Sequence, residues 1–190
     1  MDKNSKKIIG LDLDGVIIDH GSNIVEVARM FGIRLRVFDT AIDILREKVG
    51  KDIYRKINNL VFDDPEILST APIFDGVEEG LDKIRASNQQ YFLISRQKNP
   101  PLAVSNLKAK GLWNKYFNES NSFFLEEIEG KNIMTKKLGV TIYLDDQLRV
   151  LNQLEVEKKF LFDPLGNYQI GGLDYVVVSS WLEFIQSIDL

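Results

Sequence analysis

The first apolar run of the chain is Ile8-Ile9-Gly10-Leu11-Asp12-Leu13-Asp14-Gly15-Val16, which carries two alternate carboxylates into a glycine-containing turn. The run is apolar on both faces until it ends in charge, which predicts a central strand of a parallel sheet. Unpaired carboxylates are costly inside a core, so two of them at the end of a buried strand need a partner, and a divalent cation is a common one. Asp-x-Asp alone is a weak signal, because a buried hairpin whose acids cap the next turn gives the same residues.

Three further polar interruptions occur at apolar runs later in the chain. Ser95 follows the apolar residues 91–94, Lys131 lies at the start of the segment 130–134, and Asp145 and Asp146 follow residues 141–144. Ligand sites in open α/β sheets lie outside the carboxyl ends of the strands, where loops from several strands meet. We therefore expect these acids, the hydroxyl and the amine to share one crevice with the first aspartate pair.

In this ordered set of motifs the chain resembles the haloacid dehalogenase (HAD) superfamily of phosphohydrolases, over nearly its whole length. The matching residues are Asp12 to Val16, then Ser95, then Lys131, then Asp145 with Asp146. The resemblance implies that Asp12 attacks phosphorus to form an aspartyl-phosphate, and that Asp14 acts as acid and then as base. Superfamily members that cleave carbon–halogen bonds usually lack the second acid, so Asp14 favours a phosphate substrate.

The same resemblance implies a Mg²⁺ cofactor, which would shield the anionic nucleophile from the anionic phosphate. Its expected protein ligands are Asp12, the backbone carbonyl of Asp14, and one or both of Asp145 and Asp146. Mg²⁺ takes oxygen ligands in octahedral geometry and usually keeps waters and a substrate phosphate oxygen, which agrees with a set of few carboxylates.

Phosphate binding is expected from Ser95, which would donate a hydrogen bond, and from Lys131 as a compact positive charge. Arg96, directly after Ser95, is a further candidate for contact with an anionic substrate. Two alternatives remain at this stage: Ser95 could simply end its strand by bonding its own turn, and Lys136 or Lys137 lies on the same predicted helix as Lys131.

Three other polar residues have weaker claims to the site. Arg34 and Arg36 could also meet an anionic substrate, but solvated or paired side chains are the more common state of such residues. His20, the single histidine, follows the first motif and could touch substrate, and its sequence context favours an ordinary loop residue.

Composition limits the class of protein without choosing the substrate. The 190 residues carry a net charge of −4, which gives no basic footprint for a nucleic acid polymer or an anionic membrane. The absence of cysteine excludes disulfides and thiolate metal sites. With no apolar signal core near the N-terminus and no run long enough to span a bilayer, we expect a cytoplasmic enzyme.

Hydrophobic periodicity predicts an α/β fold, with a mostly parallel Rossmann-like sheet between helices. The predicted elements after residue 75 are helix 76–87, strand 91–94, helix 101–110, strand 123–125, helix 132–138, strand 141–145, helix 148–154, strands 159–162 and 174–178, and helix 181–188. Residues 22–68 instead show three helical periodicities. With this pattern, the resemblance implies a HAD-like core, residues 1–20 and 70–190, and an all-helical insertion, 21–69, that looks like the small cap of one subgroup of the superfamily.

The sequence as a whole predicts a Mg²⁺-dependent phosphatase that hydrolyses a small-molecule phosphomonoester. A phosphomutase would share the aspartyl-phosphate but return the phosphoryl group to its substrate. A catalytically idle domain that binds a phosphorylated ligand is the alternative outside enzymes. The sequence does not distinguish among sugar phosphates, nucleoside monophosphates and other small organic phosphates.

Overall fold

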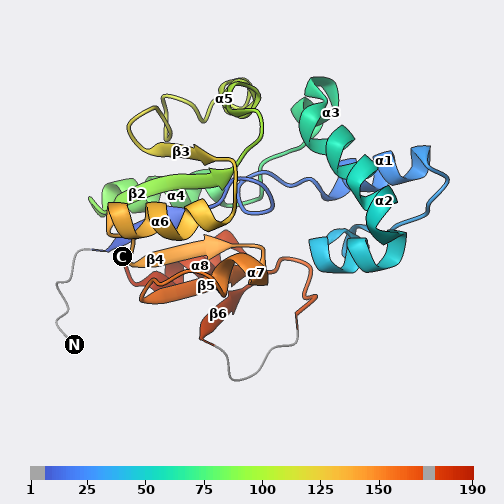
Figure 1. Ribbon diagram of the computed structural model, residues 1–190. Helices are drawn as coiled ribbons and strands as arrows, with labels where there is room; N and C mark the ends of the chain where they lie inside the picture. The colour runs from blue at the N-terminus through green and yellow to red at the C-terminus, as the bar shows by residue number, and fades with distance from the viewer. Residues whose placement is uncertain (1–6, 169–173) are drawn as a thin grey trace.

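The computed structural model describes residues 7–168 and 174–190, and its core is a sheet flanked by helices on both faces (Figure 1). The sheet has six parallel strands in the order β3-β2-β1-β4-β5-β6. Their bounds are β1 Ile8–Leu11, β2 Gln90–Arg96, β3 Ser122–Leu125, β4 Ile142–Asp145, β5 Lys158–Phe162 and β6 Tyr175–Val178. The predicted α/β class with a parallel sheet is confirmed. Residues 1–6, on which the expectation of no signal segment rests, lie outside the described residues.

Strand β1 lies in the middle of the sheet, as its apolar sequence predicts, and pairs with β2 on one side and β4 on the other. It ends at Leu11, sooner than the apolar run suggests. Gly10 is required for close packing, because a Cβ atom there would lie 2.4 Å from the ring of Tyr143. The strand hydrogen bonding continues one residue further, since the Asp12 N–H donates to the Leu144 carbonyl at 3.1 Å.

Helices cover both faces of the sheet through two separate apolar clusters. Helices α4 (Val77–Ala86), α5 (Pro100–Ala109) and α8 (Trp181–Ile188) contribute to the cluster that includes Ile9 and Leu11. Helices α6 (Glu129–Leu138) and α7 (Leu148–Leu151) contribute to the cluster around Tyr143 and Leu161 on the opposite face. The sheet is therefore buried on both sides, as parallel sheets usually are.

The chain between β1 and α4 forms a helical insertion of residues 21–70, whose last helix ends one residue beyond the predicted boundary at residue 69. It contains α1 Gly21–Met30, the 3₁₀ turn η1 Val37–Thr40, α2 Ile42–Asp63 and α3 Pro65–Thr70. Its buried side chains form an apolar cluster of their own, made of Ile24, Val27, Ala28, Leu45, Ile57 and Val61. Gly50, with φ of +73°, interrupts α2, which explains why the sequence shows two periodicities there.

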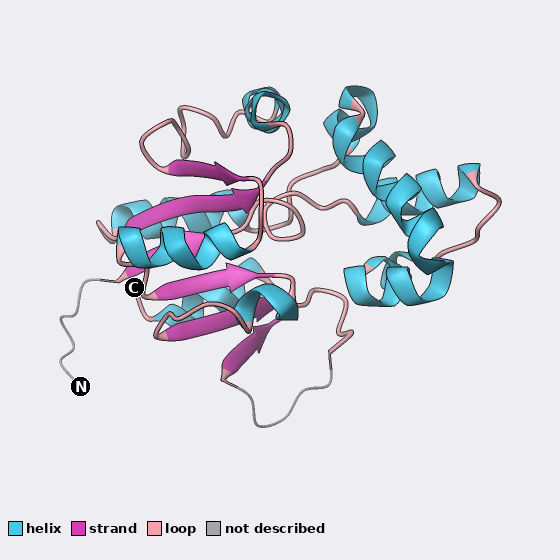
Figure 2. Cartoon of the chain, in the orientation of Figure 1, coloured by secondary structure: helices cyan, strands magenta, loops and turns pink. Residues whose placement is uncertain are grey.

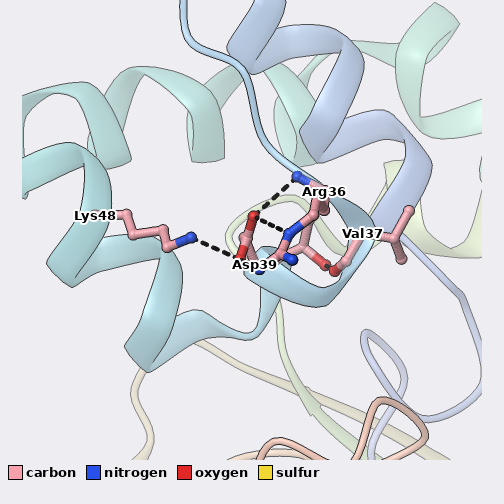
Figure 3. A network of polar contacts seen from close by, with 5 residues as sticks. Arg36, Val37, Asp39 and Lys48 are labelled. Atoms are coloured by element: carbon pink, nitrogen blue, oxygen red, sulfur yellow. Dashed lines mark hydrogen bonds and ion pairs between the residues drawn. The ribbon is translucent and has the colours of Figure 1, made fainter.

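A polar network fixes the turn η1 to helix α2 (Figure 3). The buried Asp39 carboxylate accepts hydrogen bonds from the backbone N–H and the guanidinium of Arg36, and Lys48 Nζ donates to it at 2.6 Å. These cations hold the pKa of Asp39 well below its usual range. Arg36 and Lys48 are thus engaged within the insertion.

The strands point their carboxyl ends toward the insertion (Figure 2). Loops that follow the strands and helices of the insertion therefore face one another, where a site is expected in open α/β sheets. Among residues 7–168 and 174–190, no helix combines the length and the apolar character needed to cross a bilayer.

Candidate active site

The turn after β1 is folded tightly on itself and brings Asp12 and Asp14 to the edge of the sheet. The N–H groups of Ile17 and Ile18 both donate to the Leu13 carbonyl, and the Gly15 N–H donates to the Ile18 carbonyl at 2.9 Å. Gly15 has φ of +81°, and a Cβ atom there would lie 2.3 Å from Asp146 Oδ2. Glycine at this position therefore lets the turn approach the Asp146 carboxylate.

Lys131 is the cation at the centre of the site. It is only 2% exposed, and its Nζ lies 3.0 Å from Asp12 Oδ1 and donates a 2.8 Å hydrogen bond to Asp145 Oδ2. The approach to Asp12 is an ion pair without good hydrogen-bond direction, because Asp12 Oδ1 has no hydrogen-bond partner in the described chain. Burial alone would lower the pKa of Lys131, but the charges of Asp12 and Asp145 outweigh it and raise that pKa well above its usual value. Lys131 is therefore a permanent positive charge.

The two other lysines of the same helix lie away from these carboxylates. Lys136 pairs with Glu155 at 2.7 Å in an exposed ion pair, and Lys137 is exposed. Of the three candidates, Lys131 is the lysine that the structure brings beside Asp12.

Asp12, Asp145 and Asp146 form a cluster in which each residue offers a carboxylate oxygen within 4.8 Å of the others. Asp145 is already engaged, since Oδ2 accepts from Lys131 and Oδ1 accepts from the Gln147 N–H at 2.9 Å. Asp146 Oδ1 and Asp12 Oδ1 are both buried, and neither accepts a hydrogen bond from a described residue. Three clustered carboxylates beside Lys131, two of them with a buried oxygen that accepts no hydrogen bond within the described chain, fit a divalent cation with oxygen ligands, and Asp12 and Asp146 supply those two oxygens.

The ionisation of the cluster shows the same excess of negative charge. Burial, against the opposing charge of Lys131, raises the pKa of Asp145 to about 6. Burial and the neighbouring carboxylates of Asp145 and Asp12 raise the pKa of Asp146 well above its usual value. Without a bound cation, the three carboxylates repel one another and are difficult to ionise together. A bound cation would reduce this repulsion.

Asp14 lies outside this cluster, and both of its carboxylate oxygens are held by side chains. His20 Nε2 lies 2.7 Å from Oδ1, and Gln97 Nε2 donates to Oδ2 at 2.5 Å. The structure thus assigns the Asp14 carboxylate a different environment from that of Asp12. The expectation that Asp14 contributes a metal ligand through its backbone carbonyl stays a prediction.

Ser95 and Arg96 lie at the end of β2 and line the same cavity as the aspartates. Ser95 is buried inside the strand opposite Phe124, and its Oγ makes no hydrogen bond to any described residue, so it does not serve to close a turn. Arg96 is half-buried and forms no ion pair with the described carboxylates. Both side chains are therefore available to a ligand.

The cavity has a volume of about 300 Å³ and lies between the sheet and the helical insertion. Core residues supply the polar floor, including Asp12, Asp14, Asp146 and Lys131. The insertion supplies a different wall, made of Gly21, Ile24, Val37, Thr40, Ala41, Ile42, Asn58, Asn59, Phe62 and Asp63. The described part of this wall contains no lysine or arginine. Arg34 and Arg36, considered above as candidates for anionic substrate, do not line it, and Arg36 is paired with Asp39.

Two residues of the site escape prediction from the sequence. The interpretation of His20 as an ordinary loop residue is wrong, because it is 5% exposed and bonded to Asp14. Gln97, two residues after Ser95, was not expected at all. Its position just past a strand end that carries a site residue is the one signal that could have indicated it.

Comparison with known proteins gives structural matches only. No protein-family profile matches the sequence, and no curated protein sequence matches it. Solved structures match over nearly the whole chain. A predicted phosphoglycolate phosphatase from Haemophilus somnus shares 13% identity with a TM-score of 0.61, over 98% of this chain and 100% of the other.

Two further matches have related names. A protein assigned as the HAD-hydrolase YfnB of Bacillus subtilis, solved with bound magnesium, shares 10% identity with a TM-score of 0.62, over 98% of this chain and 100% of its own. A protein assigned as a β-phosphoglucomutase from Thermotoga maritima shares 15% identity with a TM-score of 0.60, over 96% of this chain and 98% of its own. The chain therefore has the fold of the HAD superfamily, which confirms the fold that the resemblance implied. At these identities the activity has to be argued from the site.

Proposed function

We propose that the protein is a Mg²⁺-dependent phosphatase that hydrolyses a small-molecule phosphomonoester through an aspartyl-phosphate on Asp12. The observation that carries the proposal is the arrangement of two carboxylates in one cavity. Asp12 lies beside Lys131 and has a buried oxygen that accepts no hydrogen bond from a described residue. Asp14 lies apart from this lysine and is held by His20 and Gln97. One carboxylate is thus suited to attack phosphorus, and the other to exchange protons.

In the first step Asp12 attacks phosphorus, forming an oxygen–phosphorus bond as the bond to the leaving oxygen breaks. Asp14 gives its proton to that leaving oxygen. In the second step Asp14 takes a proton from water, whose oxygen attacks phosphorus and releases Asp12 with inorganic phosphate. Both steps need Asp14 within hydrogen-bond reach of the reacting oxygen.

The remaining residues stabilise and position the anionic phosphoryl group. Lys131 supplies a fixed positive charge beside Asp12, and Ser95 offers an unengaged hydroxyl for a phosphoryl oxygen. Arg96 is a second cation available to substrate. Mg²⁺, held by Asp12 and Asp146 with Asp145 beside them and the Asp14 carbonyl as a further ligand, would neutralise charge between phosphate and nucleophile.

We further propose that residues 21–69 act as a cap over a core of residues 1–20 and 70–190. The support for this division is that the insertion has its own apolar cluster and forms one wall of the cavity. A cap in this place would exclude water and contact the leaving group.

A phosphomutase stays the alternative within enzymes, and the Thermotoga maritima structure shows that this fold also hosts proteins assigned to that class. A phosphomutase acts on a substrate that carries a second phosphate away from Asp12. The insertion wall has no lysine or arginine among its described residues, so a second phosphate would have to be met by Arg96 or Lys98, which line the cavity from the core side.

The experiment is a screen of phosphorylated metabolites with Mg²⁺, comparing wild type with Asp12→Asn. We expect release of inorganic phosphate from at least one ester, loss of this activity in Asp12→Asn, and unchanged activity in the control Asp52→Asn, which alters an exposed carboxylate of α2. Isomerised sugar phosphate without free phosphate would instead establish a mutase. Binding without turnover of any ester would point to a domain that only binds its ligand.

A further inference from the structure

His20 is the only histidine in the chain, and the structure places it at the junction between the first motif and the helical insertion. Its imidazole is almost fully buried, and the ring meets Phe62 of α2 edge to face, with centroids 4.7 Å apart. Its backbone carbonyl accepts the Ile24 N–H at 2.9 Å at the start of α1. By these contacts His20, the last residue of the core segment before α1, is packed against the insertion.

The one polar contact of the His20 ring among described residues is with Asp14. Nε2 lies 2.7 Å from Asp14 Oδ1, whereas Nδ1 is buried and has no partner there. A phenylalanine would pack against Phe62 equally well, so packing does not account for a buried imidazole with one nitrogen unsatisfied. The hydrogen bond to Asp14 does, because it orients a carboxylate.

Asp14 is therefore held by one donor from each side of the cavity. Gln97 comes from the end of β2, where its own N–H donates to the Leu125 carbonyl at 2.8 Å. His20 lies directly before the insertion, with its ring against Phe62 of α2. The direction in which Asp14 points depends on both, and a proton donor misplaced by about 1 Å loses much of its effect.

We propose that His20 is a positioning residue that orients the Asp14 carboxylate for proton transfer, and that it links this carboxylate to the helical insertion. The inference rests on the proposed function, in which Asp14 protonates the leaving oxygen. It couples the acid and base step to the packing of the insertion, a role distinct from the lining of the cavity by the insertion wall.

The kinetic test compares two esters with the variants His20→Phe and His20→Gln. An alkyl phosphate needs a proton on its leaving oxygen, whereas 4-nitrophenyl phosphate releases a stable phenolate without one. We expect His20→Phe to slow single-turnover phosphoryl transfer from the alkyl ester at least about tenfold more than from the nitrophenyl ester. His20→Gln, which keeps a donor, should recover part of that difference. Equal slowing of both esters would overturn the proposal, because damage to the fold would act on both alike.

A second test observes the His20 ring directly and is combined with the turnover of the wild type. With a single histidine, the imidazole ¹⁵N signals belong to His20 alone. We expect Asp14→Asn to move the Nε2 signal at fixed pH, and the control Asp19→Asn, whose carboxylate accepts from the Gly21 N–H, to leave it in place. An unmoved signal in Asp14→Asn with normal turnover in wild type would overturn the role of His20 alone. A moved signal with no turnover of any ester would overturn the proposed function, and this role with it.

Discussion

Replacing Lys131 with methionine tests the charge balance of the site most severely. The substitution keeps the length of the buried side chain but removes the ammonium that lies 3.0 Å from Asp12 and 2.8 Å from Asp145. Removing one partner of a buried ion pair usually costs about 3–5 kcal/mol, because the remaining charge is left without compensation. That is a large part of a typical stability of about 5–15 kcal/mol.

Proton uptake by Asp145 limits the loss of stability in Lys131→Met. The pKa of Asp145 is about 6 with Lys131 present and should rise further without it. Protonating a carboxyl of pKa about 6 at pH 7.5 costs about 2 kcal/mol, so the variant can avoid part of the repulsion in this way. We therefore expect Lys131→Met to lower the free energy of unfolding by about 2–5 kcal/mol at pH 7.5 and by less at pH 5.

The assay is urea unfolding in EDTA, followed by the fluorescence of the two tryptophans. The matched control is Lys136→Met on the same helix, whose exposed pair with Glu155 should contribute under about 1 kcal/mol. A loss in Lys131→Met no larger than in the control, or a loss that does not shrink at pH 5, would refute this account of the site.

Two further predictions concern the cation and the turn. The folded pKa values of Asp145 and Asp146 are raised above those of an unfolded chain, so stability present at low pH is lost in the metal-free protein as the pH rises through the folded pKa of Asp145, about 6, and further as it rises through that of Asp146. Mg²⁺ should therefore raise the melting temperature more at pH 7.5 than at pH 5, and an equal shift at both would contradict the cluster as its site. Gly15→Ala should abolish Mg²⁺-dependent phosphate release, because its Cβ would lie 2.3 Å from Asp146, whereas Gly32→Ala, with a similar φ but open space, should cost only about 1 kcal/mol of stability and leave the activity intact.

Local signals are sufficient to predict most of the fold. The expected helix over 76–87 and strand over 141–145 differ from α4 and β4 by one residue or so at their ends. Both have a clear hydrophobic period and lie in a sheet whose two faces are covered, so tertiary packing reinforces the local pattern. The end of β1 at Leu11 could not be predicted from the sequence. The apolar residues after it are buried in the core although they lie in a turn, so their hydrophobicity looks like a continuation of the strand.

The site was predictable where residues follow strand ends and not where they depend on side-chain contacts. Asp12, Ser95 and Asp146 line one cavity as expected, since parallel strands present their carboxyl ends at the same edge. His20 and Gln97 meet at Asp14 through contacts between the insertion and the core. No spacing along the chain encodes such a contact, because it depends on how the insertion packs.

The chemical identity of the phosphorylated residue decides whether Asp12 is the nucleophile. Wild type would be mixed with a phosphate ester that it hydrolyses and with Mg²⁺, quenched in acid before the intermediate decays, and digested for mass spectrometry. The account predicts one phosphoryl group on the peptide that contains Asp12, carried by that carboxylate, and none in Asp12→Asn. A phosphoryl group on Ser95 or Asp14 would contradict the assignment of Asp12 as nucleophile. Release of phosphate without any phosphorylated protein at any time would contradict it as well.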